Sequence, residues 1–370
     1  MGKYRDVYLE QGKTLSDSGS HTVDISPIDT ISELLVNVWA DNGATSNIGS
    51  PIPRIITKIE VVDGSDILFS MDGRLAHALY YYLRGIVPEI SIAEAPNYGQ
   101  SVNIPLCFGR WLWDPLFALD PSRFKNLQLK ITWNLAAVNA VGATGFVTGS
   151  GRLSVIAKVI EDETRPTHFL MHKDQYSWTT GASGDERIPL PTDYPYAMLI
   201  LRAYEAGVNM SNSYTNLKLN IDFDKIIPLD MEDGDIKNRI IDKYGMIKLP
   251  IIGRASDGDV REAWMADPYS VVFTPNSPSA LAALQTLDAG RYTPYVRDYV
   301  GVAIAADIDL FVELLGSGIW NCHAIPFGII EDPTSYLMAQ DHGDIKVVIT
   351  QGNAGAEANI VLSQLRDYKA

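Results

Sequence analysis

Residues 71–85, MDGRLAHALYYYLRG, and residues 232–245, EDGDIKNRIIDKYG, are two versions of one pattern. Each has Asp-Gly near its start, aromatic residues near its end and a final glycine. An aspartate accepts hydrogen bonds from the first amides of a helix, and a glycine adopts the left-handed conformation that ends one. We therefore predict helices over Gly73–Arg84 and Asp235–Tyr244.

Elsewhere the hydrophobic pattern has a period of two, which is typical of half-buried strands. Ile, Val, Leu and Thr dominate these segments, and Gly, Pro, Asn or Asp bound them. The predicted strands are Ile31–Ala40, Arg54–Asp63, Gln100–Phe108, Leu127–Leu135, Arg152–Glu161, Tyr196–Ala206, Leu217–Ile227, Val300–Asp309, Cys322–Ile330, Asp344–Gln351 and Ala358–Arg366. Ser279–Leu287 is expected to form a third helix. The sequence thus predicts an all-β protein.

Strands on both sides of the two helices match in pairs, in the same order along the chain. The offset is 160 for the glycines that end the helices, 164 for Leu34–Ala40 with Met198–Tyr204, and 162 for Lys58–Gly64 with Asn220–Ile226. After the helices it is 221 for Ile104–Gly109 with Ile325–Gly328, 218 for Leu129–Thr132 with Val347–Thr350, and 206 for Val155–Asp162 with Val361–Tyr368. Six ordered matches indicate two copies of one unit.

Each copy has the length and strand count of a jelly roll, in which eight antiparallel strands form two facing sheets. We predict two consecutive eight-stranded jelly-roll barrels with short helices in the connections. The expected parts are an N-terminal arm at 1–29, a first jelly roll at 30–165, a linker at 166–190 and a second jelly roll at 191–370. The second copy carries an insertion at about 246–300. The first copy forms its barrel without such an insertion.

Composition narrows the classes of function. The chain of 370 residues has a formal net charge of −15, and phosphate binding needs a basic face. Hydrophobic residues make up 46%, enough for a full core, and charged residues 20%, which favours surface buried in contacts between chains. The start of the chain lacks the apolar core of a signal peptide. We therefore expect a protein made in a cytoplasm that does not coat nucleic acid directly.

No catalytic, cofactor-binding or metal site is predicted. Cys107 and Cys322 occupy near-equivalent strands, each beside an Ile-Pro pair, and neither has a His/Asn constellation around it, so a nucleophile is not expected. His168 and His172 have ligand-like spacing, but they fall in the expected linker. The Gly-rich loop Gly142–Gly151 lacks the Lys-Ser or Lys-Thr of a phosphate loop.

Two further groups have a structural and a functional interpretation. The acidic stretches Asp230–Asp235 and Asp257–Asp259 could bind calcium, but they do not fit the EF-hand loop, and a turn with a helix start is favoured. The aromatic residues Trp111, Trp113 and Phe117 could stack on a sugar, although packing in the core or between subunits is favoured. Bound calcium stays an open question.

The duplicated barrels, the Asp-Gly helix in each and the long insertion resemble the double jelly-roll major capsid proteins. This adenovirus-hexon-like lineage includes tailless icosahedral viruses of bacteria and archaea. The resemblance implies a homotrimer whose six barrels form a pseudo-hexagonal tile of an icosahedral shell, with the insertion as an outward tower. It implies a virion protein assembled in the host cytoplasm. The partners would be other trimers, penton and minor capsid proteins, and an internal membrane reached by the N-terminal arm.

Two rival functions use the same architecture. Some secreted glycan-cleaving enzymes contain two jelly rolls and work with a pair of carboxylic acids. A carbohydrate-binding protein would instead present tryptophans on a sheet face. A secreted enzyme is expected to carry disulfides, and two cysteines do not form a disulfide framework. The capsid interpretation is therefore favoured, with a secreted double jelly-roll glycan-acting enzyme or carbohydrate-binding protein as the alternative.

Overall fold

The computed structural model describes residues 4–25, 29–44, 47, 49, 51–138, 145–161, 165–276, 281–288 and 290–368. Strands dominate, and the α-helices of this part are α1 (Gly73–Arg84), α2 (Met210–Ser213) and α3 (Asp233–Tyr244). Short 3₁₀ turns are η1 (Ile52–Ile55), η2 (Pro121–Arg123), η3 (Leu135–Val138), η4 (Pro333–Ser335) and η5 (Ala339–Asp341). None of the described helices is long and apolar enough to cross a bilayer. The predicted all-β class is confirmed.

The first barrel contains eight long strands. They are β1 (Tyr4–Thr14), β2 (Ser18–Asp24), β3 (Thr30–Asp41), β4 (Ile56–Asp63), β5 (Asp66–Met71), β7 (Gly99–Cys107), β8 (Leu127–Asn134) and β9 (Arg152–Ile160). One sheet has the order β1-β9-β3-β7 and the other β2-β8-β4-β5. Inward side chains such as Val36 and Ile59 are fully buried between the sheets. This is the strand order of a jelly roll.

The second barrel repeats this order. Its strands are β10 (His168–Thr179), β11 (Asp185–Pro189), β12 (Tyr196–Tyr204), β13 (Tyr214–Ile221), β14 (Ile226–Glu232), β21 (Cys322–Pro326), β22 (Ile345–Gln351) and β23 (Glu357–Asp367). The two sheets are β10-β23-β12-β21 and β11-β22-β13-β14. The duplication found in the sequence is therefore present strand by strand, with α1 and α3 in equivalent connections.

Strand pairing tests the offsets between the two copies. Ile59 pairs with Ile131, and Leu217 pairs with Ile349, so the offsets of β4 to β13 and of β8 to β22 must add up to 376. The predicted offsets, 162 and 218, add up to 380, which is four residues too many; keeping 218 for the strand match makes the offset between β4 and β13 158. The slip arose because a left-handed turn follows β13: Asp222, Phe223 and Asp224 have positive φ angles. That turn also divides the predicted strand Leu217–Ile227.

The expected N-terminal arm and linker need correction. Most of residues 1–29 belongs to β1 and β2, which pair with β9 and β8. Most of residues 166–190 belongs to β10 and β11, which pair with β23 and β22. These strands were missed because they are rich in polar residues and show no apolar alternation; the apolar residues of β10 that reach the core, Phe169–Met171, are consecutive. We place the division between the jelly rolls near residues 161–167.

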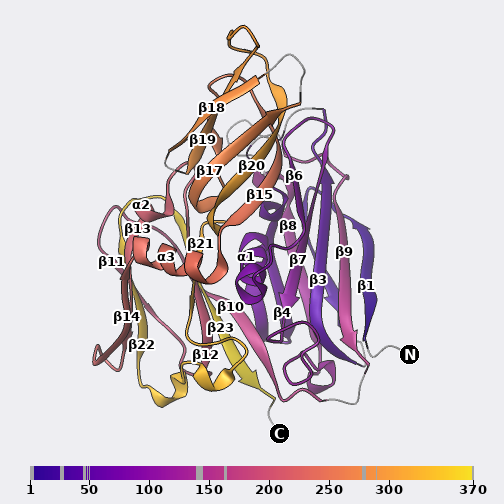
Figure 1. The fold of residues 1–370 in the computed structure, drawn as a ribbon. Helices are drawn as coiled ribbons and strands as arrows, with labels where there is room; N and C mark the ends of the chain where they lie inside the picture. Colours follow the sequence, from indigo (N-terminus) through magenta and orange to yellow (C-terminus); the bar gives the residue numbers. More distant parts are fainter. Residues whose placement is uncertain are drawn as a thin grey trace.

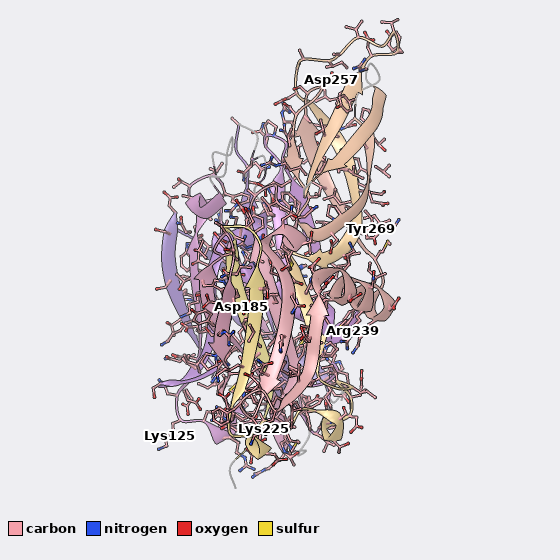
Figure 2. The ribbon with its side chains drawn as sticks, turned by 90° about the vertical axis from the view of Figure 1, so that its left-hand side faces the viewer. Lys125, Asp185, Lys225, Arg239, Asp257 and Tyr269 are labelled. Carbon is pink, nitrogen blue, oxygen red and sulfur yellow. The ribbon has the colours of Figure 1, made fainter. Side chains whose placement is uncertain are left out.

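The insertion forms a tower above the barrels (Figure 1). We use this name for residues 247–319. Its strands β15 (Ile247–Ala255), β20 (Ile308–Ile319) and β17 (Met265–Pro275) continue the first barrel's sheet beyond β7 through β6 (Ile90–Ala93). A smaller sheet has the order β16 (Arg261–Glu262), β19 (Arg291–Arg297) and β18 (Leu281–Asp288). Figure 2 shows Asp257 and Tyr269 of the tower above Asp185 and Lys225 of the second barrel.

Two predictions in the tower were wrong. Ser279–Leu287 was expected to be a helix, but residues 281–288 form β18, paired with β19 from Leu281 with Arg297 onward. Antiparallel pairing overrides the helix propensity of its Leu and Ala residues. The strand expected at Val300–Asp309 begins at Ile308 and continues to Ile319. The insertion therefore extends beyond residue 300.

Candidate functional site at the joint between the barrels

The two cysteines predicted not to be nucleophiles are buried free thiols. Burial raises the pKa of Cys107 and of Cys322 to about 12. A thiol with such a pKa is not ionised at neutral pH, and the thiolate is the reactive species. Both residues therefore act as small core side chains of β7 and β21.

The two histidines with ligand-like spacing lie on strand β10, not on a helix. His172 is fully buried and contacts the Ser363 hydroxyl at 2.8 Å and the Cys107 carbonyl oxygen at 3.1 Å. His168 contacts the neighbouring Thr167 hydroxyl at 2.9 Å. In the described residues, no three His, Cys, Asp or Glu side chains gather as a metal site.

The acidic stretches have partners within the protein. The Asp230 carboxylate accepts a hydrogen bond from the Asn216 amide. The Asp259 carboxylate accepts hydrogen bonds from the backbone amide and the hydroxyl of Ser256 and from the Arg261 guanidinium. Asp233 is the first residue of α3 and faces His323. These contacts match the turn and helix-start interpretation of both stretches. Of the Gly-rich loop, residues 142–144 lie outside the described residues.

The predicted aromatic cluster packs around an arginine. The Arg110 guanidinium lies 4.2 Å from the ring centres of Trp111 and Phe117, and it forms a two-pronged pair with the buried Asp114. Trp113 instead contacts Tyr4, with ring centres 4.7 Å apart. Arg110 also donates to the Glu331 carbonyl oxygen of the second barrel. The cluster thus helps to join the barrels.

The joint between the barrels begins with a short parallel pairing. Phe69 and Ser70 of β5 lie opposite His172 and Lys173 of β10. Through this contact, four strands of each barrel become one eight-stranded sheet, in the order β2-β8-β4-β5-β10-β23-β12-β21. The pairing fixes the barrels in one register.

An ion network around a buried arginine lies beside that pairing. Arg202 of β12, 1% exposed, donates to Asp72 at 2.6 Å and to Glu357 at 3.2 Å. Arg74 lies 3.5 Å from the same Asp72 oxygen and 3.3 Å from Glu357. Burial favours the neutral form of Asp72, but the two arginines outweigh it and lower the pKa of this carboxyl. Asp72 also accepts from the Leu75 amide, so it caps α1 and holds the second barrel at once.

The two equivalent helices meet through tyrosines. The Tyr81 hydroxyl donates to the Tyr244 carbonyl oxygen, and the Tyr82 hydroxyl donates to the Cys322 carbonyl oxygen. The rings of Tyr81, Tyr82 and Tyr244 pack within 6 Å of one another. A phenol combines apolar area with a hydrogen bond, which suits a contact between barrels that is partly buried.

A second polar cluster ties the tower to the second barrel. His323 of β21 is fully buried. Its Nδ1 lies 2.6 Å from the Tyr214 hydroxyl and 3.5 Å from Asp233, and its Nε2 lies 3.4 Å from Asp267 of β17. Burial raises the pKa of Asp233, whereas His323 outweighs burial at Asp267 and lowers its pKa. Helix α3, the tower and the barrel therefore share one network.

A polar pocket opens at the joint. It has a volume of about 380 Å³ and is lined by Lys58, Ser70, Asp72, Asp174, Tyr176 and Asn359, among others. Burial raises the pKa of Asp174 to about 6. One Asp174 oxygen accepts from Asn359 at 2.8 Å, and no donor among the described residues reaches the other.

Sequence reasoning did not find these groups. Asp72 was recognised as a helix start, but its partner Arg202 lies 130 residues away in the chain. An arginine within the apolar run YAMLILRAY was the available signal, because a buried charge requires a partner.

We expect Asp72→Asn to destabilise the protein. Asparagine still caps α1, but Arg202 would lose its nearest counter-charge, and breaking a buried pair costs about 3–5 kcal/mol. Asp66→Asn is the matched control, since Asp66 is 40% exposed and pairs with Arg366 at 2.5 Å. There the loss should be about 0–1 kcal/mol. The measurement is the free energy of unfolding in urea at one protein concentration; equal losses would contradict this account.

We expect Asp174→Asn to stabilise the protein above pH 6. The folded pKa of Asp174 lies above its unfolded value, so its contribution is favourable at low pH and is lost as the pH rises through 6. Removing the buried charge should gain up to about 3 kcal/mol at pH 7.5, and the gain should shrink toward pH 4. Urea unfolding at several pH values measures it. A loss of stability at pH 7.5 would show that the charge has a partner.

Comparison with known structures gives the fold a context. No protein-family model matches the sequence, and no curated protein shows significant similarity to it. The major capsid protein of Sulfolobus turreted icosahedral virus (STIV) superposes with a TM-score of 0.58 and 12% identity, covering 99% of this chain and 97% of that one. The major capsid protein P2 of bacteriophage PM2 gives 0.54 and 12%, covering 98% and 97%. A chain of the PBCV-1 virus capsid gives 0.58 and 10%, covering 98% and 93%.

These likenesses cover both barrels and the tower. At 10–12% identity they establish the arrangement of the chain and nothing finer. The expected fold is confirmed: the chain has the double jelly-roll fold of major capsid proteins.

Proposed function

We propose that the protein is a major capsid protein. It would assemble as a homotrimer whose six jelly rolls form a pseudo-hexagonal tile of an icosahedral virus shell. The observation that carries the proposal is the superposition of nearly the whole chain on capsid proteins from three different viruses. The joint supports it, because a rigid pair of barrels makes a building block of constant shape.

The proposal includes partners and a location. The partners are further copies of the chain, with penton and minor capsid proteins at other positions in the shell, and the location is the virion after assembly in the host cytoplasm. Direct nucleic-acid binding is not part of it, because a net charge of −15 repels phosphate. Nor is a membrane contact through an N-terminal arm, because Tyr4–Thr14 is a barrel strand.

The polar pocket at the joint is the site where a glycan-acting enzyme could have its pair of carboxylic acids. Asp72 and Asp174 line the same pocket, and their pKa values are shifted in opposite directions, as in an acid–base pair. However, one Asp72 oxygen is held by the Leu75 amide and the other by Arg202. A carboxylate committed to a helix cap and a buried arginine is poorly placed to act on a substrate. The pocket therefore favours a structural role.

We expect the purified protein to be a trimer. Size-exclusion chromatography with light scattering at micromolar concentration should give about 120 kDa, three times the 40.7 kDa chain. Permanent assemblies bury large interfaces, above about 2,000 Å² in total, and should resist dilution. A stable mass of one chain across the concentration range would overturn the proposed function.

A further inference from the structure

The two strands that form the joint inside the chain each have an equivalent strand in the other barrel, and these two equivalent strands have an unpaired edge in the part of the chain that the structure describes. Strand β5 of the first barrel pairs with β10 of the second. By fold position, β14 is the second barrel's equivalent of β5, and β1 is the first barrel's equivalent of β10. Each of these two is the last strand of its sheet, with a single neighbour, β13 for β14 and β9 for β1, in the described residues. An open strand edge is a template for pairing with another chain.

The equivalent residues follow from the strand registers together with the offsets of 158 for β4 with β13 and 206 for β9 with β23. Phe69 lies opposite Val61 in the first barrel as Leu229 lies opposite Leu219 in the second, so β5 and β14 differ by 160 residues. Val7 lies opposite Ala157 as His172 lies opposite Ser363, so β1 and β10 differ by 165. The joint's pairs, Phe69 with His172 and Ser70 with Lys173, therefore correspond to Val7 with Leu229 and Tyr8 with Asp230.

Apolar side chains on the two free strands are exposed, whereas an equivalent side chain in the joint is buried. Tyr4 of β1 is 51% exposed, whereas its equivalent Phe169 in the joint is 1% exposed. Tyr8 is 55% exposed, and Ile226 and Ile227 on β14 are 48% and 45% exposed. These apolar side chains lie on β1 and β14, the two strands with an unpaired edge.

One contact of the joint has an apolar counterpart. In the joint, Arg366 of β23 pairs with Asp66 of β5. The equivalent positions are Ile160 of β9, which is buried in its own barrel, and the half-exposed Ile226 of β14, since β9 and β23 differ by 206 residues. The ion pair inside the chain thus has two apolar residues as its counterpart, and neither of them brings an unpaired charge to the free edges.

We propose that β1 of one copy pairs in parallel with β14 of the next copy, with Val7 opposite Leu229 and Tyr8 opposite Asp230. This inference rests on the proposed self-assembly. Strands β1 and β14 lie on opposite sides of the molecule, so one chain cannot pair them with each other (Figure 1). A head-to-tail contact of this kind closes into a ring when its rotation permits, and three copies would use every such edge.

The pairing also fits the backbone of β14. The joint pairs two residues on each strand. Its counterpart would use Leu229 and Asp230 and would leave out Pro228, which has no amide hydrogen to donate. The result would be one sheet running from the second barrel of one copy into the first barrel of the next.

A disulfide test measures this register. In the variant Tyr8→Cys/Asp230→Cys, both positions are exposed, and adjacent strands about 4.8 Å apart suit a disulfide. The native cysteines are buried and do not compete. Mild oxidation of the trimer should convert most of the protein into covalent dimers and trimers on a non-reducing gel. The matched control, Tyr8→Cys/Pro228→Cys, moves one thiol two residues along β14 and should link at least fivefold less.

The outcomes separate this inference from the proposed function. A wild-type trimer in which the Asp230 variant links no better than the control would overturn the pairing and leave the trimer standing. A wild-type monomer would overturn both. Hydrogen exchange on the wild-type trimer provides a readout without substitutions: the amides of residues 5–9 and 229–231 should be protected. Fast exchange in both segments would also overturn the pairing.

Discussion

The parallel contact between β5 and β10 is the constraint on which the other features of the molecule depend. It is two residue pairs long, yet it converts two separate barrels into one sheet of eight strands. The Arg202–Asp72 pair lies beside it and shares a carboxylate with the start of α1. Because α1 in turn contacts α3 through its tyrosines, a shift at the joint would disturb both helices.

The tower depends on the same joint. Its strand β15 pairs with β6 of the first barrel, while Asp267 of β17 contacts His323 of the second. The tower therefore stands on both barrels and braces them. A buried charge network costs desolvation energy, and in some proteins it is retained because it specifies one arrangement. The proposed function would give the chain a reason to keep such a network, because a shell subunit presents the same shape at every position.

The sequence predicted the elements that are determined by neighbouring residues: helices with their capping residues, and strands with alternating apolar residues. Asp72 and Gly85 bound α1 as predicted, and the apolar alternation located β3, β8, β9 and β23 within a residue or two. Strands β1, β2, β10 and β11 were missed because their residues are polar and their pairing is long-range. The helix expected at Ser279–Leu287 is a strand because its partner β19 lies across a turn. The joint was beyond prediction, since its contacts link residues 100 to 300 positions apart.

The central claim is that two barrels, joined rigidly, tile as a ring of six in a trimer. Electron microscopy of the purified protein in negative stain tests this most directly. The account predicts class averages with a hexagonal outline, six lobes around a three-fold axis and towers on one face. Two-lobed particles the size of a single chain, at concentrations where the protein is folded, would contradict it.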